Sequence, residues 1–207
     1  MSTRIGLISD VHATPHPLKD ALEIFTQEGI ETILCAGDIA GYGPDLQQTV
    51  ELLVANGCRS ILGNHDLWWL KDFAVEEHGP IEAYLRQLPV VDELCVEGRK
   101  IAMVHGSPPA SVMEGVKLFD ENGAMIQDLR EEWSEKLRGF SADVLVVGHT
   151  HQVFAEQLGD VLVINPGSAR FNHTCAILHL PELKVEFLPL GGKEPEMVWN
   201  WGMQYRI

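Results

Sequence analysis

The chain has 207 residues and a formal charge of −15, from 15 Lys and Arg against 30 Asp and Glu. A length of this order is that of one folding unit, so we predict a single domain over residues 1–207. The acidic balance argues against extended nucleic acid as a partner, because such binding needs a basic stripe, and no apolar run approaches the ~20 residues that cross a bilayer.

The sequence runs from Met1 into a strand-like segment without the charged, apolar and cleavage regions of a signal peptide, so we expect a cytoplasmic location and no membrane partner. The four cysteines are widely spaced, with no Cys-x-x-Cys pair. We therefore expect reduced, mostly buried thiols rather than disulfides or zinc ligands.

The first part of the chain alternates short apolar strands with amphipathic helices. Apolar residues at helical spacing mark the first helix, and Gly29 is a plausible stop signal. The expected strands are Ile5–Ser9, Thr32–Ala36 and Arg59–Leu62, and the expected helices are Pro17–Glu28 and Asp45–Ala55. This βαβαβ order predicts parallel strands covered by helices.

The second part of the chain contains a hairpin and consecutive short strands, which predict antiparallel pairing. Helices are expected at Trp68–His78, Ile81–Leu88 and Asp120–Leu137, a hairpin at Glu93–Val96 and Lys100–Val104, a strand at Val144–Val147, and an antiparallel meander at Val153–Gln157, Val161–Ile164, Thr174–Leu180 and Lys184–Leu188. The fold class is therefore α/β, with one mixed sheet or two sheets packed face to face and helices outside.

Polar motifs recur at the ends of the predicted strands, where an α/β sheet presents its loops to a ligand. They are Asp10-Val11-His12, Gly37-Asp38, Gly63-Asn64-His65-Asp66, Val104-His105-Gly106 and Gly148-His149-Thr150-His151. Phosphoester hydrolysis needs a strong nucleophile and compensation of phosphoryl charge, and two metal ions ~3.5–4 Å apart supply both. The series predicts such a centre. Asp38 is the candidate bridge, because Gly37 beside it lets the backbone approach closely.

These motifs, complete and in order from Asp10 to His151, resemble the calcineurin-like metallophosphoesterase superfamily. The segments 37–45 and 165–168 are similar to its small prokaryotic phosphodiesterase branch; protein Ser/Thr phosphatases carry Asp-Arg where this chain has Gly41-Tyr42. The resemblance implies a four-layer α/β/β/α sandwich of two packed mixed β-sheets. It also implies hydrolysis of a small phosphodiester or nucleotide by a hydroxide bridging two metals. A phosphomonoesterase or a nucleotide pyrophosphohydrolase is the alternative with the same centre.

The resemblance also implies a ligand set. The first metal would be held by Asp10, His12 and His151, the second by Asn64, His105 and His149, with Asp38 between them. Ligands of this kind, without thiolate, favour Mn, Fe, Co, Ni or Zn. The negative chain charge is compatible with a small phosphorylated substrate, because bound cations reverse the local sign.

His65 is expected to stay off the metals, contact a phosphate oxygen and protonate or stabilise the leaving group. Asp66 could orient the His65 imidazole and raise its pKa, or cap the following helix. Taken singly, each motif could be a turn, a cap or a hydrogen-bonded histidine, but five blocks coinciding in type, order and placement favour the metal centre. A non-catalytic scaffold of the same fold is the second hypothesis, which the presence of His65 and all the ligands disfavours.

Several residues outside the motifs carry further expectations. Residues 165–168 are expected to form a turn that supports His149 and His151, while Arg170-Phe171 is a candidate for substrate contact. Trp68-Trp69 could be helix packing or could line a pocket. The aromatic segment 199–205 could pack on the domain or make a contact in a homo-oligomer.

Overall fold

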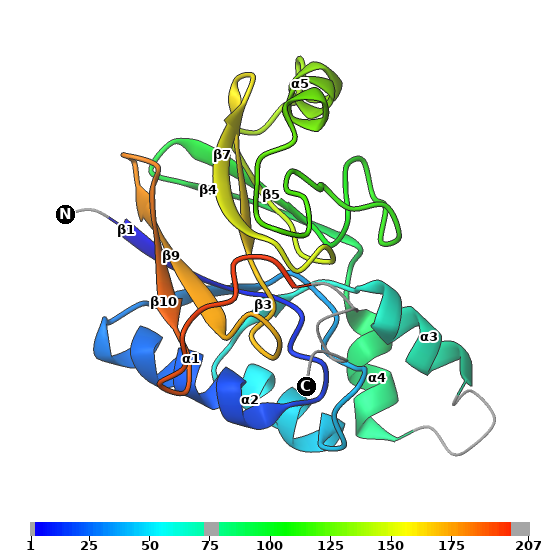
Figure 1. The fold of residues 1–207 in the computed structure, drawn as a ribbon. Coiled ribbons are helices and arrows are strands. Elements are labelled where there is room, and N and C mark those ends of the chain that lie inside the picture. Colours follow the sequence, from blue (N-terminus) through cyan, green and yellow to red (C-terminus); the bar gives the residue numbers. More distant parts are fainter. Residues whose placement is uncertain (1–2, 73–78, 200–207) are drawn as a thin grey trace.

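The computed structural model describes residues 3–72 and 79–199 of the chain. Two five-stranded mixed sheets form its centre (Figure 1). The first sheet has the order β10 (Lys184–Pro189), β9 (Thr174–Leu180), β1 (Thr3–Ile8), β2 (Thr32–Cys35), β3 (Arg59–Ser60). The second has the order β4 (Val91–Val96), β5 (Arg99–Val104), β6 (Val144–Val146), β8 (Val161–Pro166), β7 (Val153–Leu158).

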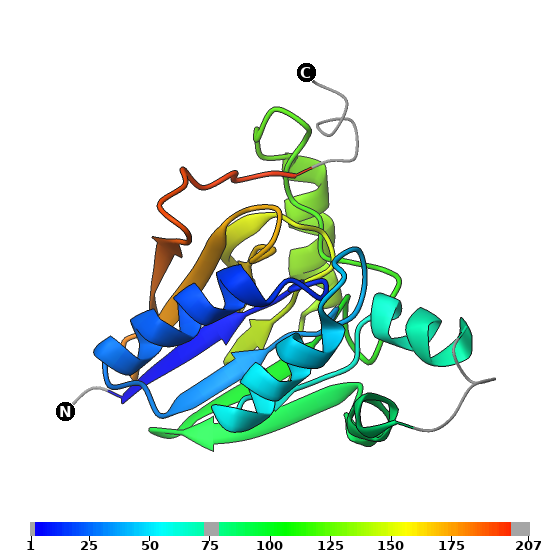
Figure 2. The same ribbon diagram turned by 90° about the horizontal axis from the view of Figure 1, so that it is seen from below.

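Helices cover the outer face of each sheet. The helices are α1 (Pro15–Gln27), α2 (Leu46–Ala55), α3 (Asn64–Asp72), α4 (Pro80–Gln87) and α5 (Gln127–Lys136). Figure 2 shows α1 and α2 lying over the strands of the first sheet, whereas α5 lies on the far side of the second sheet in Figure 1. The layer order is therefore α/β/β/α, which confirms the expected architecture.

The two sheets share a core to which both contribute. Leu7 and Leu34 of the first sheet and Met103 and Val146 of the second are fully buried in it. Burying an aliphatic side chain of this size contributes about 1.5–3 kcal/mol. This core fixes the two sheets to each other, and with them the loops at their ends.

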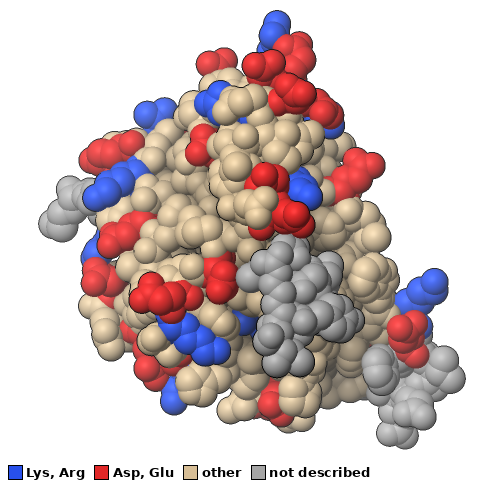
Figure 3. All heavy atoms as spheres, in the orientation of Figure 1, with Lys and Arg blue, Asp and Glu red and all other residues tan. Residues whose placement is uncertain are grey.

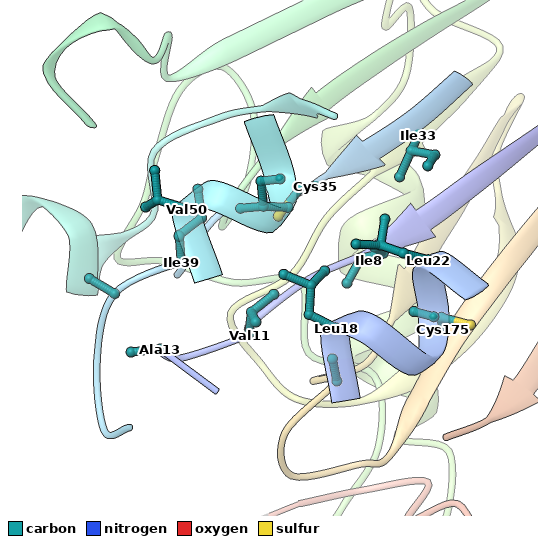
Figure 4. Close-up of a cluster of buried hydrophobic side chains, with 14 of the residues drawn as sticks. Ile8, Val11, Ala13, Leu18, Leu22, Ile33, Cys35, Ile39, Val50 and Cys175 are labelled. Carbon is teal, nitrogen blue, oxygen red and sulfur yellow. The ribbon is translucent and has the colours of Figure 1, made fainter. Parts of the chain in front are cut away.

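A second core fastens α1 and α2 to the outer face of the first sheet. Leu18 and Leu22 of α1 and Val50 of α2 belong to one buried cluster with Ile8 and Cys175 of the strands (Figure 4). The period-two alternation of β1 explains the division, because alternate side chains point to opposite faces of a strand.

Gly6 of β1 has a specific packing role on this face. A Cβ atom at this position would lie 2.8 Å from the ring of Phe25 in α1. The missing side chain therefore lets the Phe25 ring lie directly on the strand, where it is fully buried.

Most predicted elements are present, with boundary shifts, but the long helix at Asp120–Leu137 is wrong. Only Gln127–Lys136 is helical. The carboxylate of Asp120 accepts the N–H groups of Asn122 and Ala124 at 2.8 Å, and a turn is formed because this local bonding competes with the helix. The helix expected at Trp68–His78 instead begins at Asn64, and its residues 73–78 lie outside the described residues.

The predicted antiparallel meander is confirmed in its two hairpins but is wrong in joining them into one sheet. β7 and β8 form a hairpin in the second sheet, where β8 also pairs with β6 in parallel. β9 and β10 form a hairpin in the first sheet, where β9 pairs antiparallel with β1. The chain changes sheets between β8 and β9, because each hairpin completes a different hydrophobic layer.

The four cysteines are all free, as expected. Cys35 and Cys175 are buried, Cys58 is partly buried and Cys95 is exposed. Across residues 3–72 and 79–199, no helix has the length and apolar character needed to cross a membrane.

Candidate metal centre

The predicted ligands meet at one edge of the two sheets. Asp10 and His12 follow β1, Asp38 follows β2, and Asn64 opens α3 after β3; in the second sheet, His105 follows β5, and His149 and His151 follow β6. β1, β2 and β3 run parallel, as do β5 and β6. The carboxyl ends of the strands in each set therefore lie at the same edge, which explains why distant motifs converge.

Three of these side chains form one group. The Nε2 atom of His151 lies 3.2 Å from Asp10 Oδ1 and 3.2 Å from Nε2 of His12. Asp10 and His12 are fully buried, and His151 is nearly so. This is the set predicted for the first metal.

A second group surrounds Asn64. Its Oδ1 atom lies 3.1 Å from His105 Nε2 and 2.8 Å from His149 Nδ1. The Nε2 atom of His105 also lies 3.4 Å from Asp38 Oδ1. This is the set predicted for the second metal.

Asp38 connects the two groups. One set of potential ligand atoms, all within 4.8 Å of one another, contains Asp38, His105 and His149, and another contains Asp38, His12 and His65. Asp38 thus reaches a member of each predicted metal set, which is the position that a bridging carboxylate requires.

Around His105, the converging atoms are all electron-pair donors when the imidazole is neutral. The Nδ1 atom of His105 lies 2.6 Å from the carbonyl oxygen of Ala36. Because a carbonyl only accepts, this nitrogen carries the hydrogen, and Nε2 of neutral His105 presents a lone pair to Asn64 and Asp38. Such lone pairs repel unless a proton or a cation lies among them.

The first group repeats this arrangement. Nδ1 of His12 lies 3.3 Å from the carbonyl oxygen of Ala40, and its Nε2 faces Nε2 of His151. Imidazole, carboxylate and amide oxygen, with no thiolate, are ligands for divalent transition metals. The residues present therefore fit two such cations.

Buried carboxylates favour positive charge in the centre. Burial lowers the pKa of His105, but the carboxylates of Asp38 and Asp10 and the hydrogen bond to Ala36 together outweigh it and raise the value to about 9. Burial raises the pKa of Asp10, yet His151, His105 and His12 together outweigh this and hold the value well below the usual range. His12 differs: burial lowers its pKa to about 4. An ionised Asp10 and a neutral His12 are the forms that bind metals.

Two motif glycines are required by space. A Cβ on Gly63 would lie 2.1 Å from Oδ1 of Asp38, and one on Gly148 would lie 2.7 Å from Oδ2 of Asp10. Each glycine therefore lets a neighbouring strand end come close enough for the carboxylate to reach the centre.

His65 lies at the edge of the centre and is only partly buried. Its Nε2 atom is 3.1 Å from the hydroxyl of Tyr42. Burial lowers the pKa of His65. Tyr42 was not among the predicted site residues, although its place in the Gly41-Tyr42 pair, where related phosphatases differ, was the available signal.

Asp66 has the contacts of the capping alternative. Its carboxylate accepts the backbone N–H of Ala40 at 2.7 Å and of Gly63 at 2.8 Å. It is fully buried, and burial raises its pKa to about 7. These bonds join the loop after β2 to the start of α3, so Asp66 positions the segments that carry Asp38 and Asn64.

The turn after β8 supports the ligand loops, as predicted. The side chain of Asn165 donates to Gly148 O at 2.9 Å, and the Ser168 hydroxyl donates to Asp10 O at 2.6 Å. Asn172 donates to His151 O at 3.0 Å. The Arg170 guanidinium donates to Thr14 in the loop after β1 at 2.6 Å and lies over the ring of Phe171.

A pocket of about 260 Å³ opens onto the centre. It is lined by predicted ligands together with aromatic and hydroxyl side chains: Asp38, Tyr42, Asn64, His65, Trp68, His149, Thr150, His151 and Trp199. The sequence raised Trp68 as a pocket candidate. Trp199 was expected only to pack on the domain or to contact a second subunit, and its place in the pocket wall had no local signal.

The other histidines lie apart from the predicted ligand groups. His16 is 85% exposed and faces Asp20 on α1, while His179 on β9 faces Glu186. His173 follows the turn that carries Asn172. His78 lies outside the described residues.

Comparisons with known proteins give the family of the chain. The chain is 29% identical over 170 residues to a phosphodiesterase from Methanocaldococcus jannaschii, over 79% of this chain and 82% of that protein. It is 24% identical over 178 residues to phosphodiesterase YfcE from Escherichia coli K12, over 80% and 78% of the two chains. A metallophosphoesterase from Sphaerobacter thermophilus shares the fold with a TM-score of 0.69, at 22% identity over 94% and 90%. Residues 3–182 match the calcineurin-like phosphoesterase superfamily domain, and since this match spans most of the chain, the chain belongs to that superfamily.

Proposed function

We propose that the chain is a phosphodiesterase that hydrolyses a small phosphodiester or nucleotide and depends on two divalent transition-metal ions. The observation that supports this most is the close approach of buried ligand atoms in two groups: the Nε2 atoms of His12 and His151 with Asp10 Oδ1, and His105 Nε2 with the oxygens of Asp38 and Asn64. Divalent cations would satisfy these buried ligand atoms together. Mn, Fe, Co, Ni and Zn all suit these ligands.

Different residues of the protein would hold the cations and donate the proton. Asp10, His12 and His151 hold one cation, Asn64, His105 and His149 the other, and Asp38 lies between them; bound cations supply charge compensation and an activated water. His65, at the pocket edge, donates a proton to the leaving oxygen.

Diester hydrolysis is preferred over the two alternatives with the same centre. The relatives from M. jannaschii and E. coli are both named phosphodiesterases. A phosphomonoesterase or nucleotide pyrophosphohydrolase would use the same ligands, so the pocket walls must decide between them.

The charge distribution suits a small substrate rather than extended nucleic acid. On the described part of the face in Figure 3, Asp and Glu side chains are interspersed with single Lys and Arg side chains and no continuous basic stripe appears. We place the activity in the cytoplasm. A homo-oligomer formed through the aromatic C-terminal segment stays a prediction, because residues 200–207 lie outside the described residues.

Metal-dependent hydrolysis tests the proposal. Protein stripped with EDTA and reloaded with Mn, Ni, Co or Zn should hydrolyse bis(p-nitrophenyl) phosphate faster than p-nitrophenyl phosphate. Asp38→Asn should lower both metal content and turnover, whereas Asp160→Asn, at an exposed turn, should change neither. Preference for the monoester would favour the phosphomonoesterase, and hydrolysis of neither ester with any metal would favour the non-catalytic scaffold.

A further inference from the structure

The wall of the pocket is aromatic beside the centre. Trp68 is 46% exposed and Tyr42 45% exposed, although both are large side chains. Both line the pocket together with Trp199. Exposed aromatic rings gathered at one hollow mark a binding surface rather than core packing.

Trp68 lies next to the residue that meets the leaving group. Its ring centroid is 4.7 Å from that of His65, with the planes at 62°. A planar group attached to the phosphate by its leaving oxygen would therefore lie within reach of the Trp68 ring.

Trp199 is fixed to the same site from the other end of the chain. Its backbone N–H donates to His151 O at 3.0 Å, and its ring stacks on Phe171 at 5.0 Å and 20°. Phe171 in turn stacks on the ring of His151 at 5.3 Å and 27°. The superfamily match ends at residue 182, so this wall comes from a segment beyond it.

The described lining of the pocket lacks the cationic side chains that would bind a second phosphate. Among the described residues that line it, none is lysine or arginine. The nearby Arg170 is engaged with Thr14 and with the carbonyl oxygen of His12. Lys117 lines an adjoining hollow that also contains Asp120 and Glu121. This arrangement accommodates one phosphoryl group at the centre, with apolar rings around it.

We propose that Trp68 and Trp199 form the binding site for a planar aromatic group of the substrate, a nucleobase or an aryl ring, carried on a single phosphodiester. This inference rests on the proposed function, because it places the phosphate at the metal centre. It specifies the substrate class: aromatic diesters are favoured over alkyl diesters, and polyphosphate anhydrides are disfavoured. Stacking suits this role because every nucleobase and aryl ring offers a π-face.

Non-hydrolysable phosphonates test the inference through binding rather than turnover. Phenylphosphonate, cyclohexylphosphonate and methylphosphonate present the same anchoring group with a planar ring, a non-planar ring or no ring. Titration calorimetry with Mn-loaded protein should give phenylphosphonate an affinity about tenfold above that of the other two, which corresponds to about 1.4 kcal/mol. Pyrophosphate should bind no more tightly than phosphate.

Variants assign this preference to the two rings. Trp68→Ala should bring the phenyl-to-methyl affinity ratio close to one, and Trp199→Ala should lower it. Leu67→Ala is the control, because Leu67 is exposed on the same helix and is absent from the pocket lining. Trp68→Leu, which keeps an apolar side chain without a planar ring, should behave as Trp68→Ala does.

The outcomes separate the two proposals. Binding of methylphosphonate with no gain from the phenyl ring, or an equal gain from phenyl and cyclohexyl, would overturn the aromatic site and leave the metal centre standing. An unchanged ratio in Trp68→Ala would do the same. Failure of all three phosphonates to bind Mn-loaded protein would overturn the proposed function and this inference with it.

Discussion

Replacement of Gly63 by alanine tests why a glycine precedes Asn64. The added Cβ would lie 2.1 Å from Oδ1 of Asp38 and 2.4 Å from its backbone nitrogen. Ordinary van der Waals contact begins at 3.4 Å, so each approach is about an ångström or more too short. One of the two contacts is backbone, and a side-chain rotation alone cannot relieve it.

The size of the effect follows from this overlap. Forcing an extra methyl into a packed site costs about 1–3 kcal/mol, which for a chain of this length lowers Tm by about 2–12 °C. The displaced Oδ1 atom also accepts the N–H of His65 at 2.9 Å and lies 3.4 Å from His105. Metal affinity should therefore fall about 10–100-fold, the usual cost of disturbing the residues that orient metal ligands.

Thermal unfolding with and without Mn, together with metal analysis, would measure both effects. Gly79→Ala is the matched control: Gly79 has a φ of −87°, and a Cβ atom added there would meet nothing within 4 Å. It should alter stability by no more than about 1 kcal/mol. If Gly63→Ala melts and binds Mn as Gly79→Ala does, the close approach of the two loops is not a requirement of the centre.

Three further predictions address other parts of the molecule. His65→Ala should lower kcat about 100-fold or more with both metals retained; near-wild-type turnover in metal-bound protein would remove His65 from the mechanism. Asn172→Ala should lower the free energy of unfolding in urea by about 2–4 kcal/mol, because this fully buried side chain makes three hydrogen bonds to backbone groups; a loss below about 0.5 kcal/mol would contradict that role. Cys95, which is exposed, should be alkylated rapidly at pH 8, whereas burial raises the pKa of Cys58 and Cys175 to about 12 and should make them slow. Since these two thiols ionise near 9.0 when unfolded, the free energy of unfolding should fall as pH rises from 9 to 12. Alkylation of Cys58 and Cys175 as rapid as that of Cys95 would contradict the burial of these two thiols.

The position of the centre could be predicted because its signals are local. Each ligand motif follows a short apolar segment, and parallel strands bring their ends to one edge. The Asp-x-His and His-x-His spacings place both side chains of each pair in one loop. None of this requires knowledge of which strand pairs with which.

The errors arise where distant or competing contacts decide. The turn at Asp120 replaces a helix because one side chain bonds two nearby N–H groups. The separation of β8 from β9 depends on pairing with β6 and with β1, far away in the sequence. Trp199 reaches the pocket through a backbone bond to His151, a contact that no periodicity in its own segment indicates.

The backbone of the ligand loops explains how the centre keeps its shape. Five predicted ligands have φ between 49° and 65°: Asp10, His12, Asp38, His149 and His151. A left-handed conformation costs a non-glycine residue roughly 1–2 kcal/mol, and glycine would remove that cost along with the ligand. Backbone hydrogen bonds offset this cost. The N–H groups of Asp10 and His12 donate to the carbonyl oxygens of Gly37 and Asp38, and the N–H of Gly148 donates to the carbonyl oxygen of His105. Because these bonds join protein groups to one another, they would contribute to ordering the loops whether or not a cation is bound. Less of the free energy of metal binding would then be consumed in ordering the site.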